Sequence, residues 1–109
     1  MKPVGIERIS GMLGLAMRAG KLIIGTEMIC RAMPKGVAEL VVVSSGASCG
    51  TKKKLFYKCE FYSTELIEID IDTERLGRLL GKTYTPAAVA VTDHGIAEQI
   101  KEAYDALKQ

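Results

Sequence analysis

The chain has 109 residues, of which 48% are hydrophobic and 26% are charged, a composition ordinary for a globular protein with room for one domain. No apolar run approaches the roughly 20 residues that a bilayer-spanning helix requires. Glu7 and Arg8 interrupt the segment where a secretory signal would be apolar, so we expect a cytoplasmic protein without a membrane partner.

The formal net charge of +2 hides an uneven distribution along the chain. Residues 1–58 hold ten Lys and Arg against three Asp and Glu, a net +7, whereas residues 59–109 hold five against ten, a net −5. A basic first half indicates a face that can meet phosphates, and the acidic remainder favours solubility.

Cysteine and histidine are too few and too scattered for a recognisable metal site. The three cysteines, Cys30, Cys49 and Cys59, show no C-x-x-C spacing, and His94 is the single histidine. We therefore expect no disulfide framework, no metal and no cofactor, and we expect Cys59 to be a small core residue.

The chain opens with a predicted helix, a short strand and a second helix. Apolar residues at helical spacing mark the first helix, which ends near Gly20; they are Ile6, Ile9, Met12, Leu13, Ala16 and Met17. The run at 22–24 predicts a strand, and helical spacing resumes from about Thr26 to Pro34.

The next segment predicts a buried strand followed by a helix. The β-branched run at 39–45 is typical of a strand buried on both faces. The sequence GASCGT at 46–51 predicts a turn, and a helix follows through about Tyr62 with Leu55 and Cys59 inward.

A third strand is indicated at 65–72, where isoleucines alternate with acidic residues and leave one face wetter. A short helix fits Thr73 to Leu80 and ends at Gly81. The run at 86–93 predicts the last strand. The final helix, with Asp93 or Thr92 as its cap, has an inward face of Ile96, Ile100, Ala103, Tyr104 and Leu107.

Strands and helices alternate throughout, and no repeat or linker interrupts them. This order predicts an α/β fold with helices on both faces of a sheet of about four strands. We expect residues 1–109 to form a single domain.

The junction between the predicted strand at 22–24 and the next helix is the first candidate site. Such a junction exposes unpaired backbone N–H groups and the positive end of the helix dipole. Gly25 allows a positive φ or close approach of another backbone, and Thr26 can cap or donate. The outward residues of the helix are then Glu27, Met28 and Arg31. A simple strand–helix turn explains the same pattern.

Three consecutive lysines, Lys52, Lys53 and Lys54, fall in the first turn of the helix predicted after 46–51. Cations there oppose the helix dipole by roughly 0.3–1 kcal/mol each, and Lys54 with Lys58 adds a like-charge pair one turn apart. The run is either a solvated face or a binding surface. In the second case, an anionic partner would offset the stability that the lysines cost the helix.

The segment before the last predicted strand is a third candidate, because it mixes a cation, hydroxyls, an aromatic ring and small apolar residues. Such a loop can pack against an unpaired base. Its residues are Gly81, Lys82, Thr83, Tyr84, Thr85, Pro86, Ala87 and Ala88.

Enzyme signatures are weak in this chain. It has no G-x-G-x-x-G, P-loop, G-x-S-x-G or H-E-x-x-H motif. Asp93 and His94 at a strand–helix junction fit a cap and a surface imidazole better than a catalytic pair. The acidic residues between 65 and 74 fit alternating strand positions and a helix start better than a metal site.

Together, several motifs resemble the ribosomal proteins L7Ae and L30e and their small bacterial relatives. They cover nearly the whole chain: RAGKLIIGTEMICRAM at 18–33, VVVSSGASCGTKKKLFYKCE at 41–60, LGRLLGK at 76–82 and AAVAVTD at 87–93. The resemblance implies a three-layer α/β/α sandwich with a mixed sheet of about four strands. It also implies binding to RNA, above all to the kink-turn, a sharply bent element with tandem sheared G·A pairs.

The resemblance also implies particular contacts. The recognition helix of the family begins Gly-x-Asn-Glu-x-x-Lys, so Gly25 and Arg31 keep the glycine and the cation, whereas Glu27 and Met28 replace the residues that read the sheared guanines. The family's second contact is the loop that receives an extruded base, here Thr83 to Ala88. Ser48 and Lys52 match positions beside that pocket.

We therefore expect a non-catalytic, monomeric RNA-binding protein that associates with the ribosome or with structured RNA and not with DNA. The expected contacts are Gly25, Thr26, Glu27, Met28, Arg31, Ser48, Lys52, Lys53, Lys82, Thr83, Tyr84, Thr85, Pro86 and Ala87. The alternatives are a module for a protein or small anion on the same scaffold, and an enzyme that uses Asp93 and His94.

Overall fold

The computed structural model describes residues 4–107; Lys2 and both ends of the predicted domain fall outside them. The elements follow one another as α1 (Val4–Arg18), β1 (Leu22–Ile24), α2 (Thr26–Ala32), a 3₁₀ turn η1 (Met33–Lys35), β2 (Leu40–Ser44), α3 (Cys49–Phe61), β3 (Glu65–Ile69), α4 (Thr73–Leu79), β4 (Ala88–Val91) and α5 (His94–Leu107).

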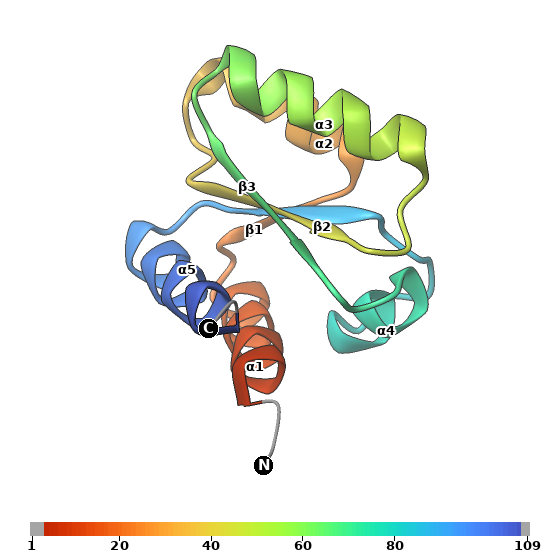
Figure 1. Cartoon of the computed structure of the whole chain (residues 1–109), viewed down its shortest axis with the longest axis vertical. Helices are drawn as coiled ribbons and strands as arrows, with labels where there is room; N and C mark the ends of the chain where they lie inside the picture. Colours follow the sequence, from red (N-terminus) through yellow and green to blue (C-terminus); the bar gives the residue numbers. More distant parts are fainter. Residues whose placement is uncertain (1–3, 108–109) are drawn as a thin grey trace.

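The four strands form one mixed sheet in the order β1-β4-β2-β3 (Figure 1). Strand β2 is parallel to β3 and antiparallel to β4, and β1 is antiparallel to β4. Val42 lies opposite Val89 on one side and Ile67 on the other. Every residue of β2 and β4 is buried, as expected for central strands covered on both faces.

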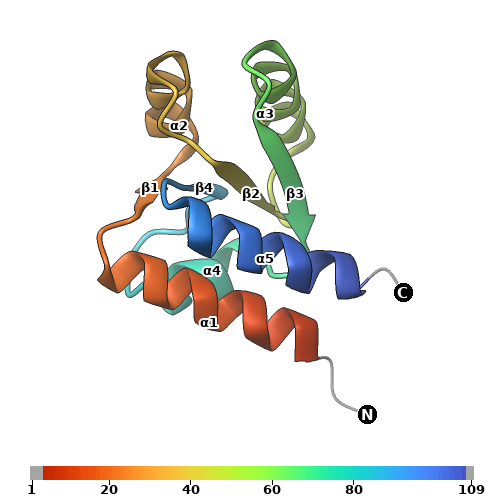
Figure 2. The same cartoon turned by 90° about the vertical axis from the view of Figure 1, so that its left-hand side faces the viewer.

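Helices α2 and α3 lie side by side on one face of the sheet, and α1, α4 and α5 cover the other face (Figures 1 and 2). This arrangement confirms the predicted three-layer α/β/α sandwich. No helix among residues 4–107 combines the length and apolar character that crossing a membrane would require.

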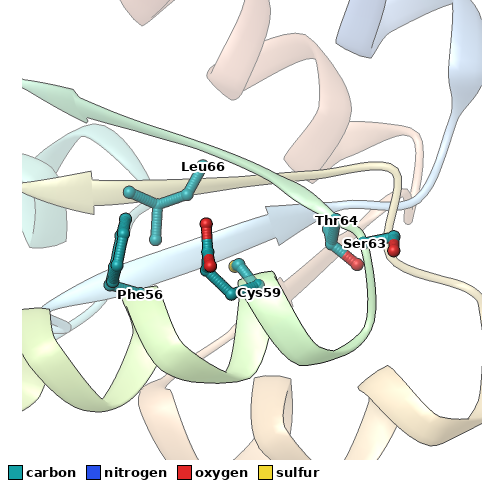
Figure 3. Close-up of a pocket in the computed structure, with 6 residues that line it drawn as sticks. Phe56, Cys59, Ser63, Thr64 and Leu66 are labelled. Carbon is teal, nitrogen blue, oxygen red and sulfur yellow. The ribbon is translucent and has the colours of Figure 1, made fainter.

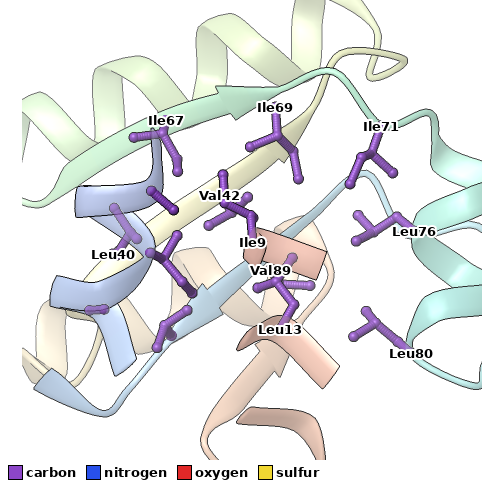
Figure 4. Packing of buried hydrophobic residues seen from close by; sticks show 14 residues of the cluster. Ile9, Leu13, Leu40, Val42, Ile67, Ile69, Ile71, Leu76, Leu80 and Val89 are labelled. Atoms are coloured by element: carbon purple, nitrogen blue, oxygen red, sulfur yellow. The ribbon is translucent and has the colours of Figure 1, made fainter. Parts of the chain in front are cut away.

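Alternate residues of the central strands point into two separate cores, because side chains of a strand alternate between its faces. Leu40 and Val42 pack toward α1, α4 and α5, where Ile9 and Leu13 are fully buried (Figure 4). The intervening residues Val41 and Val43 instead pack toward α2 and α3. The predicted inward positions Leu55 and Cys59 belong to this second core.

Helix α3 begins earlier than predicted. The segment 46–51 was expected to be a turn, but the helix starts at Cys49, because Ser48 caps it and its hydroxyl oxygen accepts from the N–H of Thr51 at 3.1 Å. Lys53 and Lys54 therefore lie in the second turn of the helix and not in the first.

Three other boundaries also differ from the prediction. The helix from Thr26 ends at Ala32 and tightens into η1, because Pro34 has no N–H with which to continue an α-helix. The predicted strand at 65–72 ends at Ile69, although Ile71 beyond it is buried.

The strand predicted at 86–93 covers only Ala88–Val91. Beyond it, the Thr92 N–H donates to Lys21 O at 2.9 Å, and Asp93 leaves the ladder to cap α5. The Asp93 carboxylate accepts from the N–H of Ile96 at 2.9 Å, which resolves the predicted choice of cap in favour of Asp93.

Candidate nucleic-acid interface

Three segments that are distant in the sequence meet at one end of the sheet: the β1–α2 junction, the β2–α3 connection and the α4–β4 loop (Figure 1). Strands β1 and β2 end there and β4 begins there, because β4 is antiparallel to both. The Gly25 N–H donates to Ala88 O at 3.0 Å, and the Ser44 N–H donates to Ala87 O at 2.8 Å. Backbone hydrogen bonds therefore hold the three segments in a fixed arrangement.

Gly25 has φ 100° and ψ 144°, a backbone conformation that side-chain-bearing residues rarely adopt. Beyond its two chain neighbours, a Cβ at this position would meet no atom of residues 4–107 within 4 Å. Of the two reasons predicted for a glycine, the structure supports the positive φ and not a close approach within the chain. Thr26 is the first helical residue, and no side chain in the described part of the protein makes a capping hydrogen bond to α2.

Helix α2 has an inward apolar face and an outward face that carries Met28 together with charged residues. Ile29 is buried in the second core, while Glu27 and Arg31 are exposed and 53% of the Met28 surface is accessible. Arg31 lies in the last turn of α2, about 9 Å along the helix axis from Gly25 at 1.5 Å per residue. The predicted cation therefore stands away from the junction itself, on the same side of the helix as Glu27.

The start of α3 supplies the basic side of this end. Ser48 is exposed, but its hydroxyl is engaged: it accepts from the Thr51 N–H and donates to Thr51 Oγ1 at 3.0 Å. The Lys52 ammonium lies 3.1 Å from the Glu68 carboxylate. Lys53 is exposed and is thus better placed than Lys52 to meet an external phosphate.

The loop from Lys82 to Ala87 is anchored at both ends and open in its middle. The Lys82 N–H donates to Gly77 O at 2.8 Å, and Pro86 is buried. Thr83, Tyr84 and Thr85 are exposed. A hollow of about 230 Å³ lies beside them, lined by Glu74, Arg78, Lys82, Thr83, Tyr84 and Thr85.

Two residues of α4 that were not among the predicted contacts, Gly77 and Arg78, shape this loop. A Cβ on Gly77 would lie 2.5 Å from Tyr84 O, so only glycine allows the loop to approach α4 this closely. Arg78 adds a guanidinium to the hollow. Nothing in the local pattern distinguishes either residue, because their importance arises from how α4 packs against a loop later in the chain.

The other chemical candidates have structural explanations. His94 is exposed, and its Nδ1 lies 3.1 Å from the Glu39 carboxylate. Among the acidic residues, Glu65 pairs with Lys101, and Asp72 caps α4 by accepting from the Arg75 N–H at 2.8 Å. Within residues 4–107, no three His, Cys, Asp or Glu side chains gather in a way that could hold a metal ion.

Shifted pKa values also follow from simple packing. Hydrogen bonds to Glu65 and Glu98 raise the pKa of Lys101, and the bond from Lys101 lowers the pKa of Glu98. Burial, and secondarily the nearby Cys30 thiol, raise the pKa of Cys59 to about 11. These shifts reflect surface ion pairs on α5 and a buried core thiol.

The fold and this end of the sheet define a small α/β/α domain that gathers a glycine junction, lysines and a loop with an exposed aromatic ring in one place. Residues 7–101 match the model of the ribosomal protein L7Ae/L30e/S12e/Gadd45 family. The chain belongs to that family, as the motifs predicted.

Similar proteins of known name support the same family membership. RNA-binding protein YlxQ of Enterococcus faecium is 35% identical over 97 residues, which cover 88% of this chain and 90% of that protein. YlxQ of Bacillus subtilis is 35% identical over 89 residues, or 82% and 87% of the two chains. The large ribosomal subunit protein eL30 of Spodoptera frugiperda is 28% identical over 95 residues, or 87% and 84%. None of these names describes an enzyme.

Solved structures confirm the fold class. A protein of unknown function from Bacillus halodurans superposes with a TM-score of 0.83 at 34% identity, over 92% of this chain and 98% of that one. The 15.5 kDa RNA-binding protein of Giardia lamblia has a TM-score of 0.77 at 16% identity, over 93% and 85% of the two chains. The second similarity shows that the architecture persists when most residues differ.

Proposed function

We propose that this protein is a non-catalytic, monomeric RNA-binding protein of the cytoplasm, formed by one domain over residues 1–109. Its partner is a structured RNA of the kink-turn type, in ribosomal RNA or another RNA, and not DNA or a membrane. One observation carries the proposal. The Gly25 N–H donates a hydrogen bond to Ala88 O, which joins the Gly25 junction to the 82–88 loop beside the lysines of α3.

Each of the three segments can make a different kind of contact with the RNA. Lys53 and Lys82 supply charge toward phosphates, which position an RNA without reading its sequence. The exposed ring of Tyr84 and the hollow beside it can receive an unstacked base. Glycine at position 25 leaves the junction without a side chain, so that an RNA backbone can approach it closely.

Recognition of sheared guanines has to differ from the family pattern. The Glu27 carboxylate can accept from a guanine amino group but repels nearby phosphates, and Met28 offers packing without a polar contact. Both side chains are exposed on α2, so both are available to an RNA. We expect this protein to discriminate kink-turns less sharply than a member carrying Asn and Glu at these positions.

The test is a titration of fluorescent kink-turn RNA and of an unbent duplex over a series of salt concentrations. Replacing both Lys53 and Lys54 with Ala should lower the affinity for both RNAs and flatten the salt slope by about one for each phosphate that is no longer neutralised. Lys35→Ala is the matched control, because Lys35 is an exposed lysine beyond the far end of α2.

An unchanged slope in the double variant, or an equal loss in Lys35→Ala, would show that the α3 lysines are a solvated face. Failure of the wild-type protein to bind either RNA would contradict the proposal and favour a module for a protein or a small anion.

A further inference from the structure

The outer face of α3 carries aromatic side chains that the core does not use. Phe56, Tyr57 and Phe61 are 49%, 64% and 78% exposed, whereas Leu55 and Cys59 of the same helix fill the core. Three exposed rings within six residues form an apolar surface of the kind that marks an interaction site. None of them belongs to the three segments of the interface described above.

Lysines are interleaved with these rings. Lys53 and Lys54 each lie one helical turn before Tyr57, and Lys58 lies one turn before Phe61, positions at which side chains on a helix are neighbours. Lys52 pairs with Glu68, but Lys53 and Lys54 are exposed. The sequence of α3 holds four lysines and a single acidic residue, Glu60.

The combination of exposed aromatic rings and lysines indicates which kind of ligand the outer face of α3 fits. Stacking rings beside cations are what single-stranded nucleic acid requires, because every base has a π face and every nucleotide carries a phosphate. The mutual repulsion of the lysines is relieved by a polyanion and not by a neutral apolar partner. These rings and lysines form a stripe from Lys53 to Phe61, about 12 Å long at 1.5 Å per residue. Lys53, at the start of the stripe, also belongs to the candidate RNA interface.

A pocket of about 290 Å³ adjoins the stripe between α3 and β3 (Figure 3). The Phe56 ring forms one wall, and Leu66 and Cys59 lie toward the sheet. Glu60, Ser63 and Thr64 supply polar groups around the same pocket. A base that leaves the stack can pack on an aromatic ring and present its polar edge to such groups.

We infer that the outer face of α3 is a second RNA contact, which stacks unpaired nucleotides that flank the structured element held at the end of the sheet. The inference rests on the proposed function in one respect, namely that a structured RNA is held at the end of the sheet beside the start of α3. It adds a surface that lies on a different part of the molecule and recognises a single strand.

The test compares a kink-turn RNA with and without a single-stranded tail of six uridines at either end. For the wild-type protein, one of the tails should raise the affinity at least about fivefold, the gain expected from one stacked base. Replacing both Tyr57 and Phe61 with Ala should abolish this gain and leave the affinity for the untailed RNA unchanged.

Two controls separate stacking from general damage. Tyr57→Phe keeps the ring and should keep the gain from the tail. Leu15→Ala removes an exposed apolar side chain from α1, on the opposite side of the sheet, and should also keep the gain. Because Tyr57 and Phe61 are exposed, urea unfolding should show nearly wild-type stability for the double variant.

A tail that adds nothing for the wild-type protein, or a gain that survives in the double variant, overturns the inference; the first result is also the one expected if the face binds another protein. The free hexauridine strand separates the two proposals. Suppose that the untailed RNA does not bind the wild-type protein, whereas the free strand binds the wild-type protein and not the double variant. The proposed function then fails and the second contact stands. If neither RNA binds, both fail.

Discussion

Replacing Gly25 with Ala tests the junction through its backbone alone. Apart from Gly25 itself and its two chain neighbours, no atom of residues 4–107 lies within 4 Å of the position that the new Cβ would take, so the substitution introduces no clash with another segment. The cost comes from φ 100° and ψ 144°, which an alanine holds only at an expense of about 1–3 kcal/mol. If the backbone rotates to relieve this strain, it weakens the bond from the Gly25 N–H to Ala88 O, worth about 0.5–1.5 kcal/mol.

The two routes lead to different effects that can be measured separately. If the junction keeps its shape in Gly25→Ala, the strained backbone lowers the free energy of unfolding in urea, but RNA affinity is retained. If the junction rotates, the β1–α2 turn separates from the 82–88 loop, and RNA affinity falls. We expect rotation to dominate, because Gly25 is half-buried and not enclosed. Gly25→Ala should therefore lose about 1–2 kcal/mol of stability and bind kink-turn RNA at least tenfold more weakly, and the bulkier Gly25→Val should abolish binding.

Gly36→Ala is the matched control for this experiment. Gly36 also has a positive φ, 69°, with open space around its Cβ position, but it follows η1 beyond the far end of α2. An alanine there should cost a similar amount, about 1–2 kcal/mol, while RNA affinity is unchanged. Full RNA binding by Gly25→Ala, or an equal loss of binding by Gly36→Ala, would refute the role assigned to the junction.

Three further predictions concern other parts of the interface. The double variant Glu27→Asn with Met28→Glu should bind a kink-turn more tightly by about 1–3 kcal/mol and an unbent duplex as before, in titrations at one salt concentration; no gain would place recognition in the backbone and the loop. Gly77→Ala should lose about 1–3 kcal/mol in urea unfolding, because its Cβ would lie 2.5 Å from Tyr84 O, and should weaken RNA binding; wild-type behaviour would mean that the loop is freely mobile. Cys49 is exposed at the start of α3, so bound RNA should slow its alkylation, and an unchanged rate would place the RNA elsewhere.

Much of the fold could be predicted because hydrophobic periodicity reports directly on burial. After Glu39, the run at 39–45 has no polar residue to place on a wet face until Ser44, and β2 is buried along its whole length. The outward and inward residues of α2 followed from helical spacing in the same way. The sheet order and the pairing of β1 with β4 required the structure, because strand pairing depends on contacts between distant segments.

Boundaries were harder to predict where side-chain caps compete with turn signals. Ser48 and Gly50 are typical turn residues, yet in this chain the Ser48 hydroxyl begins a helix two residues before the predicted turn ends. Pro86 looked like the start of a strand, but it has no N–H to donate to a ladder and lies buried against Gly77.

The candidate site was only partly accessible from the sequence. The need for glycine at position 25 could be anticipated, as either a positive φ or a close backbone approach, but only the structure distinguished the two. The pairing of Lys52 with Glu68 could not, since the two residues are brought together by α3 packing beside β3. The same holds for Arg78, whose place in the hollow beside Tyr84 depends on tertiary packing.

The most direct test of the proposed RNA interface is a map of backbone amide shifts, measured by ¹H–¹⁵N correlation spectra during titration with an untailed kink-turn RNA. If RNA binds at the proposed interface, the largest changes cluster at residues 25–28, 48–53 and 82–88, which meet at one end of the sheet. Changes confined to α1 and α5 on the opposite face, with these three segments unaffected, would contradict it.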